Sequence, residues 1–178
     1  MTSAATKPAA RVAVVVMGVS GCGKSTVAAG IATSLGLRYI DGDDLHSPES
    51  VARMRAGIAL QDEDRWPWLD RIAAALADPT SAPVGTVVAC SALKRSYRDR
   101  IRAGAPAVRF VFLDGPAELI RERMAARAGH YMPGALLESQ LRTLEPPGTD
   151  ETDVRRVGIE GEPDEIIGRA VQALRTVR

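Results

Sequence analysis

The sequence is poor in the features that mark several protein classes. Its 178 residues include only two cysteines, Cys22 and Cys90, which excludes a disulfide framework and favours a reducing compartment. No apolar run approaches the roughly 20 residues that a membrane-spanning helix requires. The first residues also lack the apolar core of a secretory signal peptide. We therefore expect a cytoplasmic protein that does not bind membranes.

An excess of charge of one sign is missing too. Lys and Arg total 23 and Asp and Glu total 22, which argues against a general nucleic-acid-binding protein. Lysine is scarce, because only Lys7, Lys24 and Lys94 stand among the 23 basic residues. Hydrophobic residues make up 46% of the chain, which is enough to bury a core.

Short apolar runs alternate with segments of helical pattern. Residues 12–17 form a continuous apolar run rich in valine, which is typical of a strand buried on both faces of a parallel sheet. Further strands are expected at residues 38–41, 86–90, 108–113 and 153–159. Helices are expected at residues 26–35, 48–56, 64–77, 94–103, 116–127, 135–144 and 163–177. The alternation predicts one α/β domain over residues 11–178 with a mainly parallel sheet, preceded by a frayed tail over residues 1–10.

A glycine-rich segment follows the first predicted strand directly. It reads Gly-Val-Ser-Gly-Cys-Gly-Lys-Ser and fits the phosphate-binding pattern G-x-x-x-x-G-K-[ST]. Glycines let backbone amides approach a phosphate closely, and the next helix presents its positive N-terminus to the same anion. Lys24 is expected to contact the β- and γ-phosphates of ATP and Ser25 to coordinate Mg²⁺. The predicted nucleotide-binding residues are Gly18, Val19, Ser20, Gly21, Cys22, Gly23, Lys24, Ser25 and Thr26. The alternative is a glycine-rich turn that fits the pattern by chance, but the strand before it and the helix after it favour nucleotide binding.

Acidic residues follow the second predicted strand. The third strand ends at Cys90 and Ser91 without a carboxylate, so Asp41 is the nearest candidate for a second Mg²⁺ ligand. No Asn-Lys-x-Asp run is present, which excludes a guanine-specific GTPase. Small-molecule kinases often place carboxylates after this strand, next to the acceptor, and Asp43 is in that position.

Several segments beyond the phosphate loop have a specific pattern. The sequence resembles the small P-loop gluconokinases, which are relatives of shikimate kinase and the nucleoside monophosphate kinases. The resemblance rests on Asp41-Gly-Asp-Asp-Leu-His46, Asp64-Arg-Trp-Pro-Trp-Leu69, Cys90-Ser-Ala-Leu-Lys94, Arg123-x-x-x-Arg127, His130-Tyr-Met132 and Ser139-Gln140. Cys22, Ser47, Ser50 and Arg53 depart from the usual pattern.

The resemblance implies a fold and a reaction. The fold is a five-stranded parallel sheet of order 2-3-1-4-5 flanked by helices. The reaction is ATP- and Mg²⁺-dependent phosphorylation of D-gluconate at the 6-hydroxyl, and the family suggests a homodimer. Asp43 is expected to hydrogen-bond or deprotonate that hydroxyl, with ordering of Mg²⁺-bound water or a turn cap as the alternatives. Asp41 is expected to hold Mg²⁺ through water.

The acceptor carries a carboxylate that requires a cation. By resemblance to shikimate kinase, Arg65 is the expected clamp, with a surface ion pair to Asp62 or Asp64 as its alternative. Arg53 is a second candidate, and Lys94 follows the third strand at the edge where parallel sheets bind ligands. The predicted substrate-binding residues are Asp43, His46, Arg53, Arg65, Ser91, Lys94 and His130.

Two arginines precede a short glycine-bounded segment. Arg123 and Arg127 lie one helical turn apart, so they share a face of the expected helix. Residues 128–134 are expected to form a lid that brings one arginine to the transferring phosphoryl group, with a solvated helix face as the alternative. The predicted catalytic residues are Lys24, Asp43, Arg123 and Arg127. Two rival functions remain at this point: a kinase for a different acceptor, and a non-catalytic sensor of ATP or a sugar acid.

Overall fold

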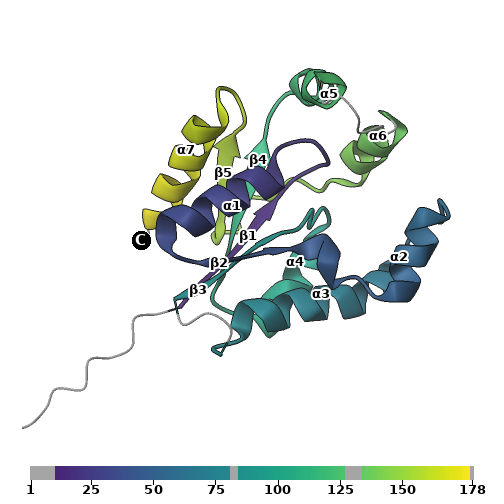
Figure 1. The fold of residues 1–178 in the computed structure, drawn as a ribbon, viewed down its shortest axis with the longest axis horizontal. Helices are drawn as coiled ribbons and strands as arrows, with labels where there is room; N and C mark the ends of the chain where they lie inside the picture. Colours follow the sequence, from purple (N-terminus) through teal and green to yellow (C-terminus); the bar gives the residue numbers. More distant parts are fainter. Residues whose placement is uncertain (1–10, 81–83, 127–133, 177–178) are drawn as a thin grey trace, which may run out of the picture.

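The computed structural model describes residues 11–80, 84–126 and 134–176. Their core is a five-stranded sheet in which every pair of neighbouring strands is parallel (Figure 1). The strands are β1 (Val12–Met17), β2 (Arg38–Asp41), β3 (Gly85–Ala89), β4 (Val108–Asp114) and β5 (Val154–Gly158). Their order is β2-β3-β1-β4-β5, which confirms the predicted fold.

Helices cover both faces of the sheet. They are α1 (Lys24–Leu35), α2 (Pro48–Arg55), α3 (Asp62–Ala77), α4 (Arg95–Gly104), α5 (Ala117–Ala126), α6 (Gly134–Thr143) and α7 (Pro163–Arg175). The buried residues of α1 and α7 form one hydrophobic cluster with the sheet, and those of α3 and α4 form a second cluster on the opposite face. In Figure 1 the two pairs of helices lie on either side of the strands. No helix in the described part of the chain has the length and apolar content to cross a bilayer.

The apolar run of β1 follows from this two-sided burial. Val14 and Val16 belong to the cluster with α1 and α7, whereas Val15 and Met17 belong to the cluster with α3 and α4. Successive side chains of a strand point to opposite faces, so a strand covered on both sides has no polar alternation. Burial on both faces therefore explains the pattern that identified the strand.

The predicted elements are all present, with shifted ends. Helix α3 begins at Asp62 rather than Asp64, because Asp64 caps it by accepting a hydrogen bond from the Gln61 amide at 2.8 Å. Helix α2 begins as predicted after Ser47, whose hydroxyl accepts from the Ser50 amide at 3.1 Å.

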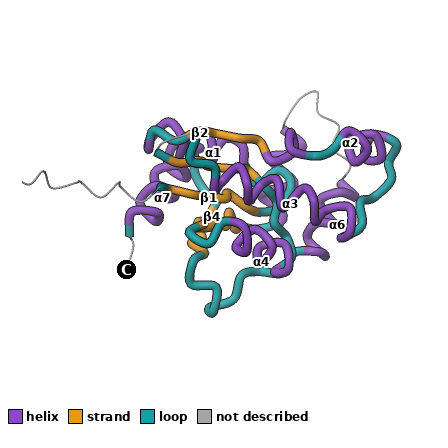
Figure 2. Tube along the Cα trace, turned by 90° about the horizontal axis from the view of Figure 1, so that it is seen from below, coloured by secondary structure: helices purple, strands orange, loops and turns teal. Residues whose placement is uncertain are grey.

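One element was not predicted from the sequence. A short 3₁₀ helix, η1 (Gly42–Leu45), follows β2 directly. Gly42 makes it possible, because a Cβ atom there would lie 2.5 Å from the Ala89 carbonyl oxygen of β3. The turn therefore lies tightly against β3 and brings Asp43 to the carboxyl edge of the sheet, where α2 and α6 also lie (Figure 2).

Candidate active site

The loop between β1 and α1 has a backbone that only glycine fits. Gly21 has a φ of +82°, and a Cβ atom there would lie 2.5 Å from Cγ of Met124. Gly23, with a φ of +97°, is the left-handed residue that caps α1. The Lys24 ammonium donates to the Val19 carbonyl at 3.0 Å, so it lies back over the loop that precedes it. Strand, loop and helix thus have the arrangement that the phosphate-binding pattern predicts.

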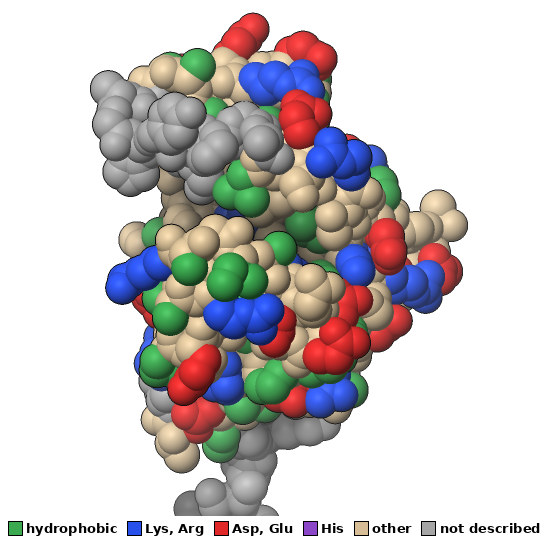
Figure 3. All heavy atoms as spheres, turned by 90° about the vertical axis from the view of Figure 1, so that its right-hand side faces the viewer, with side chains coloured by type: hydrophobic (Ala, Val, Ile, Leu, Met, Phe, Trp, Pro, Cys, Tyr) green, Lys and Arg blue, Asp and Glu red, His purple; other side chains and the backbone are tan. Residues whose placement is uncertain are grey.

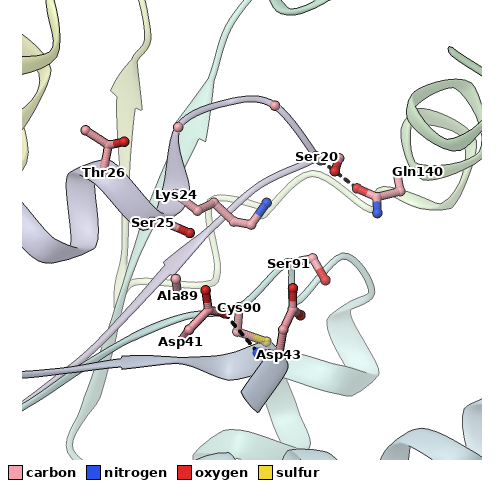
Figure 4. A pocket seen from close by; sticks show the side chains of 12 residues that line it. Ser20, Lys24, Ser25, Thr26, Asp41, Asp43, Ala89, Cys90, Ser91 and Gln140 are labelled. Carbon is pink, nitrogen blue, oxygen red and sulfur yellow. Dashed lines mark hydrogen bonds between the residues drawn. The ribbon is translucent and has the colours of Figure 1, made fainter. Parts of the chain in front are cut away.

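A pocket of about 220 Å³ opens beside this loop. It is lined by Ser20, Gly21, Gly23, Lys24, Ser25, Thr26, Asp41, Asp43, Ala89, Cys90, Ser91 and Gln140. Figure 4 shows Lys24 and Ser25 at the start of α1, with Asp41, Asp43 and Ser91 across the pocket from Lys24. The fold therefore gathers most of the predicted nucleotide and metal residues, together with Asp43 and Ser91, around one space.

The two carboxylates of this pocket influence each other. The Asp41 carboxylate accepts a hydrogen bond from the Asp43 amide at 3.0 Å, which fixes the turn between them. Desolvation raises the pKa of Asp43 above its ordinary value, and the neighbouring charge of Asp41 raises it further, while Lys24 opposes the shift. A carboxylate with a raised pKa accepts a proton more readily, which suits a group that faces an acceptor hydroxyl.

The oxygen donors of the pocket fit Mg²⁺ bound together with phosphates. Mg²⁺ in such sites takes one or two protein ligands and completes its octahedron with phosphate oxygens and water. Among the described residues no cluster of three or more His, Cys, Asp or Glu side chains forms a metal cage. Ser25 and Asp41 place two oxygen-bearing side chains beside the phosphate loop, which would suit such a site.

A second pocket, also of about 220 Å³, lies against other atoms of the same loop. It is lined by Gly21, Cys22, Gly23, Thr26, Val27, Arg123, Gly161, Glu162, Pro163 and Ile166. Arg123 donates to the Gly161 carbonyl at 3.0 Å, so this arginine belongs to the second pocket rather than to the pocket that holds Asp43. The phosphate loop is thus shared by two adjoining spaces, which suits an extended ligand.

The predicted acceptor cations lie outside the first pocket, around α3. Arg53 pairs with Asp64 at 2.6 Å, and Lys94 pairs with Asp62 at 2.9 Å. The Tyr97 hydroxyl donates to the same Asp62 carboxylate at 2.5 Å.

Arg65 differs from these two cations. It donates to the Tyr97 hydroxyl at 3.4 Å and lies over that ring, with 5.7 Å from Cζ to the ring centroid. It has no carboxylate within salt-bridge distance in the described part of the chain, so its ion pair with Asp62 or Asp64 is not formed. Figure 3 faces the side on which α2 and α6 lie, and acidic and basic side chains are interspersed over its described part.

His46 packs rather than lining the first pocket. Its ring stacks on Trp68 with 4.2 Å between ring centroids, and the Trp68 indole donates to the Gly42 carbonyl at 2.7 Å. Burial, with the nearby charges of Arg65 and Arg71, lowers the pKa of His46 to about 4, so the ring is neutral at pH 7. Its stacking fixes η1, and thereby Asp43, against α3.

Two predicted residues and most of the predicted lid lie outside the described residues. Arg127 and His130 are among them, and only Gly134 of the expected lid is described, as the first residue of α6.

Comparisons with known proteins show the family of the chain. The AAA domain family model matches residues 14–147. The thermosensitive gluconokinase of Escherichia coli strain K12 is 43% identical over 164 residues, which cover 92% of this chain and 88% of that protein. The gluconokinase of Gluconobacter oxydans strain 621H is 46% identical over 158 residues, covering 89% and 88%. The chain belongs to the AAA domain family and to the gluconokinase family. A solved gluconokinase from Sinorhizobium meliloti 1021 is 47% identical and superposes with a TM-score of 0.83, covering 92% of this chain and 91% of the other.

Membership of the gluconokinase family confirms the resemblance drawn from the sequence. The structure also brings to the site residues for which the sequence alone suggests no role. Gln140 of α6 lines the first pocket and accepts a hydrogen bond from the Ser20 amide. It follows Ser139 in one of the segments that carried the resemblance, but the sequence alone offers no reason to bring α6 to the phosphate loop.

A second residue missed in the sequence is Arg98, which is fully buried. Its guanidinium forms two hydrogen bonds with Glu151, at 2.6 and 2.7 Å, and donates to the carbonyls of Ala92 and Leu93. Those carbonyls belong to the loop between Ser91, which lines the pocket, and Lys94. In this member of the gluconokinase family, Arg98 therefore holds one wall of the site in place.

Proposed function

We propose that the chain transfers the γ-phosphoryl group of ATP to the 6-hydroxyl of D-gluconate, giving 6-phospho-D-gluconate and ADP. The observation that carries this proposal is the placement of Asp43 opposite Lys24 and Ser25 in one pocket, in a chain of the gluconokinase family. A phosphoryl-transfer site needs phosphate ligands on one side and an acceptor-facing carboxylate on the other, and this pocket has both.

Four side chains of the pocket have a proposed role in this reaction. When bound, ATP supplies the phosphoryl group and Mg²⁺ offsets the negative charge that accumulates on it. The amides of the phosphate loop and the Lys24 ammonium would hold the phosphates, and Ser25 and Asp41 would hold Mg²⁺. Asp43 accepts the proton of the 6-hydroxyl as the hydroxyl oxygen bonds to the γ-phosphorus and the bond from that phosphorus to the bridging oxygen of ADP breaks. Phosphoryl transfer depends mainly on positioning and charge, so a strong base is not needed.

The second pocket extends the nucleotide site. Its apolar wall, formed by Val27, Pro163 and Ile166, offers a surface for the nucleoside, and Arg123 adds a positive charge at its border. We place Arg123 on the nucleotide for this reason. The role of Arg127 on the transferring phosphoryl group stays a prediction from the sequence.

Arg65 is the proposed partner of the gluconate carboxylate. Arg53 and Lys94 each already form a salt bridge. Arg65 donates a hydrogen bond to Tyr97 and has no described carboxylate within salt-bridge distance. A guanidinium can bind a carboxylate through two parallel hydrogen bonds, which gives both affinity and orientation.

Replacing Arg65 by alanine is expected to erase much of the preference for gluconate over glucitol, which has an alcohol in place of the carboxylate. A charged hydrogen bond contributes about 1.5–3 kcal/mol, and stranding its buried partner costs a similar amount. The wild-type protein should therefore prefer gluconate by roughly a hundred-fold or more in kcat/KM. Arg65→Ala should lower kcat/KM for gluconate and leave glucitol nearly unchanged, as measured by steady-state kinetics with both acceptors.

Arg65→Lys is the matched variant for this test. It keeps the charge and loses the planar fork, so it should restore only part of the preference. Equal losses for gluconate and glucitol would show that Arg65 supports the fold or the phosphates instead, and Arg53 or Lys94 would take its place in the proposal.

An acceptor panel tests the function itself. ADP release is measured with gluconate, shikimate, other sugar acids and nucleoside monophosphates as acceptors, and the product is identified by mass spectrometry and NMR. Turnover with gluconate and a phosphate at its 6-oxygen is the expected result. Turnover with another acceptor and none with gluconate would assign a different substrate. Binding of ATP and gluconate without ADP release would indicate a sensor.

A further inference from the structure

The Gln140 side chain joins α6 to the phosphate loop. Its Oε1 atom accepts a hydrogen bond from the Ser20 backbone amide at 2.6 Å, across 120 residues of sequence (Figure 4). Both residues line the first pocket, so this bond lies on its wall.

This bond decides which way the Gln140 amide is turned. A backbone N–H can only donate, so the side-chain oxygen must face Ser20 and the amide nitrogen must face away from it. Figure 4 shows that nitrogen pointing into the pocket, on the side of Ser91. No hydrogen bond from it to another described residue is formed, so its two N–H groups are available to a ligand.

Helix α6 holds Gln140 firmly enough for this role. Leu137, one turn before it, is 1% exposed and belongs to the hydrophobic cluster with α1 and α7. Glu138 pairs with Arg121 of α5 at 2.6 Å, which ties the helix to its neighbour. The Leu144 amide donates back to the Gln140 carbonyl at 2.8 Å, so the backbone at Gln140 is hydrogen-bonded as well.

The chemistry of the pocket indicates which ligand these N–H groups suit. Asp41 and Asp43 are acceptors and Lys24 is a cation that meets phosphate. A polyol hydroxyl can donate its O–H to a carboxylate and accept a hydrogen bond at its oxygen, and on the Ser91 side of the pocket the Gln140 amide offers two N–H donors for that purpose.

We propose that Gln140 contacts the acceptor: its Nε2 donates to a hydroxyl oxygen of the bound polyol while its Oε1 remains on the Ser20 amide. The proposal rests on the proposed function, because it takes the acceptor to be a sugar acid. One amide group thus connects the acceptor directly to the phosphate loop and sets the distance between them.

Two substitutions test the donor and the acceptor function of the Gln140 amide. Gln140→Glu keeps an oxygen for the Ser20 amide and loses both donors, whereas Gln140→Met keeps a similar length and loses the donors and the acceptor. Both variants should lower kcat/KM for gluconate by about 10- to 100-fold, since each removes a hydrogen bond to the substrate. The dissociation constant of ATP for Gln140→Met should change by less than about three-fold, because Ser20 then offers its amide to the nucleotide.

Deoxygluconates identify the contact. Each lacks one hydroxyl, and for one of them the wild type and Gln140→Met should have the same kcat/KM, because the bond that the variant loses is already absent. Arg142→Gln is the control, since it changes an exposed side chain of the same helix and should leave the kinetics unaltered.

Two results would overturn the proposal. One is a loss of ATP affinity in Gln140→Met that equals its loss of kcat/KM, because Gln140 would then act through the phosphate loop alone. The other is a loss of kcat/KM from wild type to Gln140→Met that is equal for every deoxygluconate. Turnover of gluconate by the wild type, measured first, tests the proposed function separately, and the Gln140 variants are then assayed with whichever polyol acid the wild type phosphorylates and its deoxy analogues.

Discussion

Replacing Lys24 by alanine is expected to lower kcat by about a hundred- to thousand-fold while the protein stays folded. The Lys24 ammonium lies over the phosphate loop, where it donates a hydrogen bond to the Val19 carbonyl. The ammonium can replace this neutral partner by a phosphate oxygen of ATP, whose negative charge grows in the transition state. Loss of one such electrostatic contact costs about 3–4 kcal/mol in the barrier. Initial rates at saturating ATP and gluconate measure the effect, and circular dichroism checks the fold.

Arg100→Ala is the control for Lys24. It also removes one positive charge, but from an exposed pair with Asp70 in which the arginine side chain is 47% exposed. Its kcat should equal that of the wild type. A Lys24→Ala protein that retains more than about a tenth of the wild-type kcat would contradict the role given to the loop.

The second large effect concerns stability. Glu151→Gln should lower the free energy of unfolding by about 3–5 kcal/mol, because it leaves the Arg98 guanidinium buried without its counter-charge. The two side chains are 1% and 2% exposed, and their two hydrogen bonds measure 2.6 and 2.7 Å. Chemical denaturation followed by circular dichroism measures the change.

The exposed pair of Arg100 and Asp70 makes a matched control. It has nearly the same two-bond geometry, at 2.6 and 2.7 Å, with both side chains about half exposed. Asp70→Asn should therefore cost less than about 1 kcal/mol. Replacing both members of the buried pair, as Arg98→Met with Glu151→Leu, should recover much of the lost stability, since no buried charge is left alone. Equal effects of Glu151→Gln and Asp70→Asn would refute this account of the pair.

The same pair predicts a dependence on pH. Hydrogen bonds from Arg98, and then from Arg102, lower the pKa of Glu151 from 4.5 to about 2 in the folded protein. A carboxylate with a lowered pKa contributes stability that is complete above the unfolded value of 4.5 and is lost as the pH falls towards 2. The difference in unfolding free energy between the wild type and Glu151→Gln should therefore shrink over that interval.

The sequence was sufficient to predict the layout of the fold because its signals are local. The valine run of β1 and the glycines of the phosphate loop each depend on neighbours within a few residues, and both proved correct. The placement of Asp43 in the pocket also agrees with the sequence, although the 3₁₀ helix that carries it was missed. That turn depends on the close approach of Gly42 to Ala89 of β3, which is a contact between segments distant in sequence.

Side chains whose partners are distant in sequence could not be predicted. Arg98 reads as one of several arginines on an amphipathic helix, and only its pairing with Glu151, 53 residues later, shows that it is buried. The same holds for Gln140 and Ser20, which lie 120 residues apart. Arg53 and Lys94 were reasonable candidates for the acceptor by residue type, but their carboxylate partners on α3 depend on how that helix lies against its neighbours.

The strand that leads into the phosphate loop is buried much more deeply than α2. β1 pairs with β3 on one side and β4 on the other, and the residues from Val14 to Met17 are fully buried. α2 has Ser50 as its one buried residue, and Met54 near its end is 43% exposed. Segments with few buried contacts open at a much lower free energy than core strands. If α2 borders the acceptor as the proposed function requires, substitutions in α2 are expected to change the range of sugar acids that the protein accepts and to leave nucleotide binding unaltered.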